Sequence, residues 1–124
     1  MDTHVYVISA GADGPVKIGI SNSPHGRLSG FQTSSPVSLT LVHSFAMPNR
    51  EIALQIEGMF HDTQKHRRVR GEWFDLKPMD AVYLLAMGIE ISLRHNCHDF
   101  DEQMLNACFQ KCGVHAAFEM GRSD

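Results

Sequence analysis

Two runs of β-branched and apolar residues, separated by a glycine-containing break, constrain the fold of this chain most strongly. The runs are residues 3–8 and 16–20, and residues 11–15 lie between them. β-Branched residues favour strands, glycine and aspartate favour tight turns, and proline does not fit a paired central strand. The pattern therefore predicts an antiparallel hairpin that places Tyr6 beside Lys17.

Tyr6 and Lys17 are the polar-tipped side chains of these two otherwise apolar strands. An ammonium group next to a phenol favours the phenolate form, and the phenol pKa falls as a result. We therefore expect Lys17 to lower the pKa of Tyr6, which makes this phenol a candidate acid–base group.

The next segments predict a helix, a strand and a second helix. The first helix begins at Pro24, directly after the capping residue Ser23, and runs to about residue 31. Residues 39–45 alternate as a third strand. One face of this strand is expected to hold Leu39, Leu41, His43 and Phe45. Apolar residues at helical spacing then predict a helix that opens near residue 48.

Glu57 and His61 lie four residues apart on this second helix, so both side chains project from one face. Apolar neighbours indicate that the face looks inward, where a carboxylate needs a cation or a hydrogen-bond donor. A divalent cation would meet that need, and an ordinary surface pair of glutamate and histidine is the alternative.

The only dense basic run covers residues 65–70 and includes Lys65, Arg67, Arg68 and Arg70. Such a run either contacts phosphates or forms a solvated face. Residues 72–76 predict a short strand whose aromatic side chains are expected in the core.

Two further helices are predicted after residue 76. The first runs from residue 78 to about 95, and the last is capped by Asp99 or Asp101 and breaks near Gly113. They either cover the sheet or form a dimer surface, since they are rich in methionine and phenylalanine. Four side chains there allow either a zinc site or ordinary buried thiols. These are Cys97, Cys108, Cys112 and His115.

Length and charge leave several classes of function open. The chain has 124 residues, which suits one domain, and a formal net charge of −3. Residues 1–76 hold seven basic and seven acidic side chains, whereas residues 77–124 hold four basic and seven acidic ones. The first part can therefore still have a nucleic-acid partner. The absence of a signal peptide or apolar span predicts a cytoplasmic protein without a membrane partner, and its three cysteines are expected to be reduced thiols.

The order and spacing of several motifs resemble the GIY-YIG nuclease superfamily. The branch that is most similar has KIG in the second half-motif and a terminal GEWF, and it is common in phage and bacterial proteins. The matching residues are His4-Val5-Tyr6, Lys17-Ile18-Gly19, Arg27, Glu57, His61 and Gly71-Glu72-Trp73-Phe74. His4 replaces the first glycine of the family name and Lys17 replaces its second tyrosine.

The resemblance implies an α+β fold with a small three-stranded antiparallel or mixed sheet flanked by helices. Residues 1–76 would form the nuclease core, and residues 77–124 would add two helices that pack on the core or form a homodimer surface. The implied activity is hydrolysis of DNA with Mg²⁺ or Mn²⁺ held by Glu57. The implied catalytic residues are Tyr6, Lys17, Arg27, Glu57 and His61. The implied substrate-binding residues are Gly19, Ser21, His25, Lys65, Arg67, Arg68 and Arg70.

Two other classes of function also fit the sequence. A nuclease-like fold that binds nucleic acid or a protein without cutting is consistent with the missing motif tyrosine and with the zero net charge of residues 1–76. A protein-interaction role built on the C-terminal helices is consistent with their apolar content.

Overall fold

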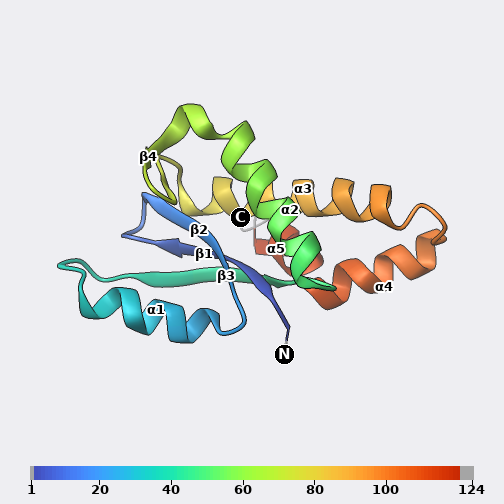
Figure 1. Cartoon of the computed structure of the whole chain (residues 1–124), viewed down its shortest axis with the longest axis horizontal. Coiled ribbons are helices and arrows are strands. Elements are labelled where there is room, and N and C mark those ends of the chain that lie inside the picture. Colours follow the sequence, from blue (N-terminus) through green and yellow to red (C-terminus); the bar gives the residue numbers. More distant parts are fainter. Residues whose placement is uncertain (1, 121–124) are drawn as a thin grey trace.

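The computed structural model describes residues 2–120 and has an α+β architecture in which helices flank one sheet (Figure 1). The predicted fold class is therefore confirmed. The elements, in chain order, are β1 (His4–Ser9), β2 (Val16–Ser21), α1 (Pro24–Thr33), β3 (Thr40–Ala46), α2 (Arg50–Thr63), the 3₁₀ turn η1 (Lys65–Arg67), β4 (Arg68–Arg70), β5 (Trp73–Phe74), α3 (Pro78–Asn96), α4 (Glu102–Cys112) and α5 (Val114–Met120).

The sheet is fully antiparallel, with the order β3-β1-β2-β5-β4. The prediction of three strands is wrong, because five are present. Of the two additional strands, β5 falls within the short strand predicted over residues 72–76. The strand that was missed altogether is β4, which lies within the basic run and has only exposed side chains. Its three residues include a single apolar side chain, which is too little to indicate a strand, so its strand geometry comes from pairing with β5 across the turn at Gly71.

The predicted hairpin of β1 and β2 is confirmed, and its register refines the position of Tyr6. Tyr6 pairs with Gly19, whereas Lys17 pairs with Ile8. Opposite residues in an antiparallel pair share a face, and so do residues two positions apart on one strand. Tyr6 and Lys17 are thus diagonal neighbours on one face of the sheet.

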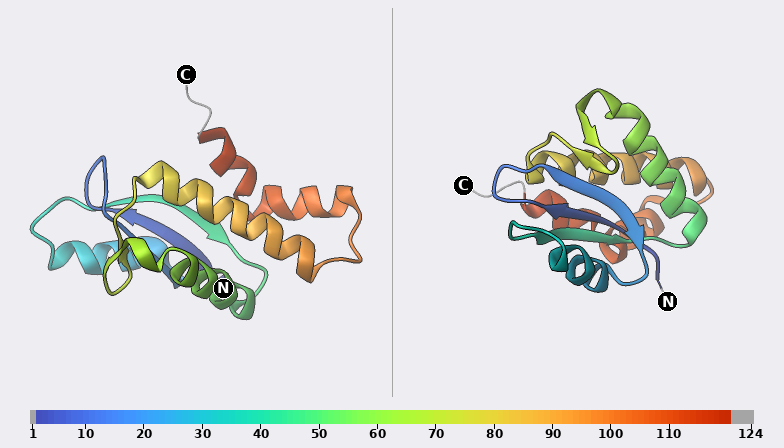
Figure 2. Two further views of the ribbon diagram at one scale, coloured as in Figure 1. Left: turned by 90° about the horizontal axis from the view of Figure 1, so that it is seen from above. Right: turned by 60° about the vertical axis from the view of Figure 1, so that its left-hand side comes forward.

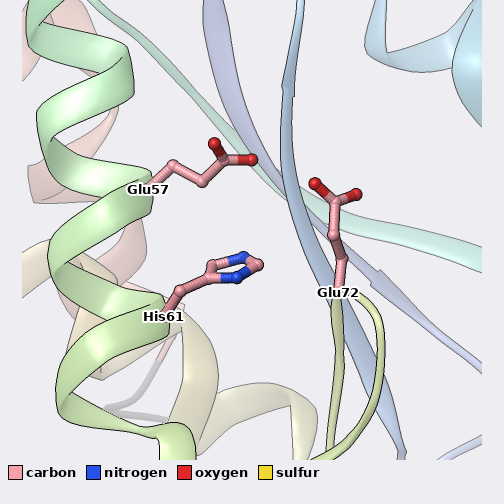
Figure 3. Close-up of side chains that lie close together, drawn as sticks. All are labelled: Glu57, His61 and Glu72. Atoms are coloured by element: carbon pink, nitrogen blue, oxygen red, sulfur yellow. The ribbon is translucent and has the colours of Figure 1, made fainter.

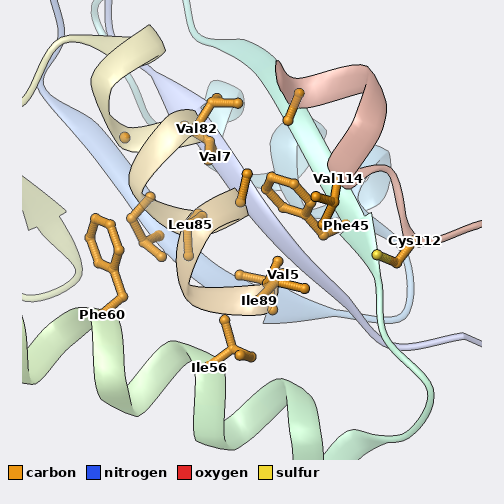
Figure 4. Packing of buried hydrophobic residues seen from close by; sticks show 14 of the residues in the cluster. Val5, Val7, Phe45, Ile56, Phe60, Val82, Leu85, Ile89, Cys112 and Val114 are labelled. Carbon is orange, nitrogen blue, oxygen red and sulfur yellow. The ribbon is translucent and has the colours of Figure 1, made fainter. Parts of the chain in front are cut away.

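The two faces of the sheet are covered by different helices (Figure 2). Val5 and Val7 of β1 point into a large core formed with residues of α2, α3, α4 and α5 (Figure 4). On the other face, Tyr6 and Ile8 pack with Leu39 and with residues of α1. The C-terminal helices therefore cover the sheet, and a dimer surface on their outer side stays a prediction. No helix among residues 2–120 has the length and apolar character needed to cross a bilayer.

The prediction that Leu39, Leu41, His43 and Phe45 share one face is wrong. A bulge changes the register between β1 and β3, because Ile8 pairs with Leu41 but Val7 pairs with His43. The extra residue in β3 reverses which side chains point to which face. Leu39 and Leu41 pack with Tyr6 and Ile8, whereas Phe45 joins the large core.

Side-chain caps fix the helix starts that the sequence predicts. Ser23 Oγ accepts a hydrogen bond from the backbone N–H of Gly26 at 3.3 Å, and Asn49 Oδ1 accepts one from Ile52 at 2.9 Å. Asp101, rather than Asp99, caps α4. The first two caps set where α1 and α2 begin, and these helices carry Arg27, Glu57 and His61.

Candidate active site

The candidate site lies along β2, just past the point where its pairing with β5 ends. β5 pairs with β2 only at Val16 and Lys17. At the next residue, the Ile18 N–H donates to the carbonyl of Glu72 at 3.1 Å, and the Ile18 carbonyl lies 3.1 Å from His61 Nε2. One residue of β2 therefore fixes the β4–β5 hairpin on one side and α2 on the other.

Glu57, His61 and Glu72 form a group whose potential ligand atoms all lie within 4.8 Å of one another (Figure 3). It is the only group of three or more metal-capable side chains within residues 2–120. A carbonyl only accepts hydrogen bonds, so His61 Nε2 must donate to Ile18 and the neutral ring keeps a free lone pair on Nδ1. Two carboxylates and one imidazole nitrogen suit a divalent cation.

The electrostatics of Glu57 agree with such a site. Burial raises the pKa of the Glu57 carboxyl, and the negative charge of Glu72, which lies within hydrogen-bonding range, raises it further. His61 and Arg50 oppose this shift to a smaller extent. The two carboxylates are thus incompletely compensated by the protein, and a divalent cation between them would relieve their repulsion.

Gly19 allows the Tyr6 phenol to reach this group. A Cβ at position 19 would overlap the Tyr6 hydroxyl and would lie only 2.7 Å from Tyr6 Cζ and 3.2 Å from Glu72 Oε1. The absence of a side chain at Gly19 therefore leaves space for the phenol ring next to Glu72. This contact gives a physical reason for glycine in the KIG motif.

The pKa of Tyr6 is raised rather than lowered, so the expected effect of Lys17 on this phenol is wrong. Burial is the main cause, and the charge of Glu72 adds to it. Arg27, which makes a hydrogen bond with the phenol, acts in the opposite direction. The Lys17 ammonium instead lies 3.3 Å from Glu72 Oε1, where the two charges form an ion pair.

We predict that Tyr6 of the metal-free protein titrates above its ordinary pKa of 10.0. The neutral phenol is favoured in the fold, so its contribution to stability is complete below pH 10 and is lost as the pH rises through the higher folded value. The chain has two tyrosines, so Tyr6→Phe leaves Tyr83 alone and the difference between the two proteins isolates Tyr6. The measurement is an ultraviolet titration of the wild type and Tyr6→Phe, and a Tyr6 value below 10 would restore the original expectation.

Lys17 is held firmly by its surroundings. Its ammonium lies 4.5 Å from the ring centre of Phe31 and 5.7 Å from that of Trp73. Its side chain is only 14% exposed. Cation–π contacts and the ion pair with Glu72 together fix this charge beside the carboxylate group.

Arg27 projects from the first turns of α1 toward Tyr6. Its guanidinium lies 4.8 Å from the ring centre of Phe31 and makes a hydrogen bond with the Tyr6 phenol, yet the residue stays exposed. Because this guanidinium is exposed, its remaining N–H groups can donate hydrogen bonds to a phosphate that arrives from solvent.

The structure brings the five residues predicted as catalytic into one neighbourhood together with Gly19, but the other residues predicted to bind substrate are more scattered. Ser21 Oγ accepts a hydrogen bond from the Ser23 N–H at 2.9 Å, so it supports the approach to α1. His25 is exposed on α1. The basic residues Lys65, Arg67, Arg68 and Arg70 are all exposed on η1 and β4, next to the turn that leads to Glu72.

The predicted zinc alternative receives no support from the described residues. Cys97, Cys108, Cys112 and His115 do not form a group of three potential ligands there. The Cys112 thiol is buried and contacts the Phe109 carbonyl at 3.5 Å. The His115 ring lies against the Phe109 ring. Cys112 and His115 thus take part in packing rather than in a metal site.

Sequence reasoning assigned Glu72 to the terminal motif without a chemical role. Its side chain is the second carboxylate of the group. The sequence feature that could have indicated this role is an acidic residue directly before the two aromatic residues of a short strand.

A separate cavity of about 630 Å³ lies between η1 and α3, and none of the three residues of the group lines it.

Fold and site together define an α+β module that carries a carboxylate-imidazole group beside the fixed ammonium of Lys17 and the exposed guanidinium of Arg27. In the family comparison, residues 3–87 match the model of the T5orf172 domain. The chain belongs to the T5orf172 domain family, a phage-associated family often linked to nucleases. No curated protein and no solved structure showed a significant match.

Proposed function

We propose that the chain is a metal-dependent endonuclease of GIY-YIG type that hydrolyses DNA phosphodiester bonds in the cytoplasm. The observation that supports this most directly is the group of Glu57, His61 and Glu72 close to Tyr6 and to the guanidinium of Arg27. A carboxylate-based cation site beside a cationic clamp can stabilise the negative charge that develops when a phosphodiester is hydrolysed.

The side chains divide the chemistry among them. Arg27 would bind the non-bridging oxygens and stabilise the charge that develops on the phosphate. Tyr6, as the neutral phenol, would orient the attacking water, and Nδ1 of His61 would accept its proton. Glu57 would hold Mg²⁺ or Mn²⁺, which when bound polarises the scissile phosphate.

Access to Tyr6 depends on Arg27 in this proposal. Tyr6 has no exposed surface in the structure. Its hydroxyl therefore meets water only after a neighbouring side chain moves. In this proposal that side chain is the exposed Arg27, which would leave the phenol to bind the phosphate of the substrate. Substrate binding would thus uncover the phenol that acts on water.

The basic residues of η1 and β4 would bind the DNA backbone next to the site. Lys65, Arg67, Arg68 and Arg70 are exposed, as phosphate contacts require. We assign Ser21 and His25 to the rim of the same surface, whereas the buried Gly19 would act only through the space that it leaves for Tyr6 and Glu72. With one such site among residues 2–120, cleavage of both strands would need a homodimer or two encounters.

The test is incubation of purified protein with supercoiled plasmid in Mg²⁺, in Mn²⁺ and in excess EDTA. We expect nicked circles to appear before linear DNA with either metal, and no cleavage in EDTA. Circular dichroism on the same samples shows whether the protein is folded. Folded protein without cleavage in either metal would contradict the proposal.

A binding module without catalysis is the second candidate. The complete burial of Tyr6 and its raised pKa favour it, because both oppose a phenolate in the free protein. This candidate predicts that DNA is retained equally well in Mg²⁺ and in EDTA. Metal-dependent nicking in the plasmid assay would rule it out.

A further inference from the structure

Glu72 occupies a position for which the mechanism above provides no role. Its Oε1 lies 3.3 Å from the Lys17 ammonium, and its carboxylate lies within 4.8 Å of the potential ligand atoms of both Glu57 and His61. Figure 3 shows the carboxylates of Glu57 and Glu72 facing each other across the space between α2 and the β4–β5 hairpin. Glu72 is therefore either a partner of Lys17 alone or a second ligand of the cation.

An ion pair with Lys17 accounts for only part of this arrangement. One ammonium balances one of the two carboxylates, and a partly exposed ion pair of this kind is a weak interaction. The ion pair with Lys17 does not require the Glu72 carboxylate to face that of Glu57. Two facing carboxylates repel each other when no cation lies between them.

Several contacts hold Glu72 in this unfavourable place. Its backbone carbonyl accepts a hydrogen bond from Ile18 at 3.1 Å. Gly19 leaves the space that the Glu72 carboxylate occupies, since a Cβ there would lie 3.2 Å from Oε1. Lys17, fixed against Phe31, holds Oε1 itself. A ligand held in position before the metal arrives loses little freedom on binding, which is the usual design of a metal site.

We infer that Glu72 is a second carboxylate ligand of the divalent cation, together with Glu57, and that Lys17 is its positioning residue. The inference rests on the proposed function, because it concerns the same cation site. The β4–β5 hairpin, whose first strand carries Arg68 and Arg70, would then also supply a ligand to the metal.

The experiment measures Mn²⁺ binding to the DNA-free protein by electron paramagnetic resonance of the unbound ion. It compares the wild type with Glu57→Gln, Glu72→Gln and Glu51→Gln. Glu51 lies in the first turn of α2 and is exposed, so its substitution removes the same charge outside the group. We expect Glu57→Gln and Glu72→Gln each to weaken Mn²⁺ binding about tenfold or more, and Glu51→Gln to change it little.

The outcomes separate the two claims. Loss of binding in Glu57→Gln with unchanged binding in Glu72→Gln would overturn the role of Glu72 and leave the nuclease proposal standing. Absence of Mn²⁺ binding in the wild type would overturn both. If Glu72→Gln does not fold, the carboxyl carbon resonances of the wild type decide: Mg²⁺ should shift those of Glu57 and Glu72 but not that of Glu51, and an unshifted Glu72 resonance would refute the inference.

Discussion

Replacing Glu57 with glutamine is expected to reduce metal-dependent cleavage of DNA by about a thousandfold or more while the protein stays folded and still binds DNA. A bound cation contributes several kcal/mol to transition-state stabilisation, and about 4 kcal/mol corresponds to a thousandfold in rate. Glutamine keeps the size of the side chain but removes the charge that faces Glu72. Since that charge is repelled in the free protein, its removal should not destabilise the fold.

The measurement is the rate of plasmid nicking at saturating Mg²⁺, accompanied by thermal melting and by DNA retention on a gel in EDTA. Glu51→Gln is the matched control, because it makes the same substitution on the same helix at an exposed position. Nicking by Glu57→Gln at the wild-type rate would remove Glu57 from the mechanism. A melting temperature far below that of Glu51→Gln would mean that the substitution acts through the fold.

The elements of the site could be predicted where the information is local. The hairpin follows from strand propensity and its turn, and the spacing of Glu57 and His61 places both on one face of α2. Ser23 and Asn49 mark the starts of the two helices that carry site residues. These features depend on residues within a few positions of one another, so a single sequence contains them.

The partners of the charged residues could not be predicted, because they depend on register and packing. Lys17 was expected beside Tyr6, but the diagonal register and the β4–β5 hairpin place Glu72 within 3.3 Å of its ammonium. Arg27 approaches the phenol instead. β4 is held by its pairing with β5 and not by its own composition. Electrostatic relations between distant segments therefore required the three-dimensional structure.

The bulge in β3 illustrates the same limit within one strand. Alternation predicted one face for Leu41 and Phe45, but a single extra residue sends them to opposite faces. As a consequence, Leu39 and Leu41 pack in the cluster that buries Tyr6, while Phe45 packs in the large core on the other face. Nothing in the alternation of residues 39–45 indicates where the extra residue lies.

Replacing Arg27 with alanine should reduce the cleavage rate by about a hundredfold to a thousandfold and should also raise the pKa of Tyr6 further. The first effect follows from the loss of a group that stabilises developing charge on the phosphate. The second follows because Arg27 is the residue that lowers the pKa of this phenol, through a hydrogen bond and through its charge. Arg27→Lys should recover part of the rate, since it keeps the charge but loses the forked geometry.

The measurements are nicking rates in Mg²⁺ and the ultraviolet titration of Tyr6 in the metal-free variants. Arg94→Ala is the control, because Arg94 is an exposed arginine on α3 that pairs with Glu102 and takes no part in the site. A reduced rate with an unchanged Tyr6 titration would mean that Arg27 acts on the phosphate alone. If neither quantity changes, Arg27 is not the clamp, and the phosphate must be bound by another cation, with Lys17 the nearest fixed charge to Glu72.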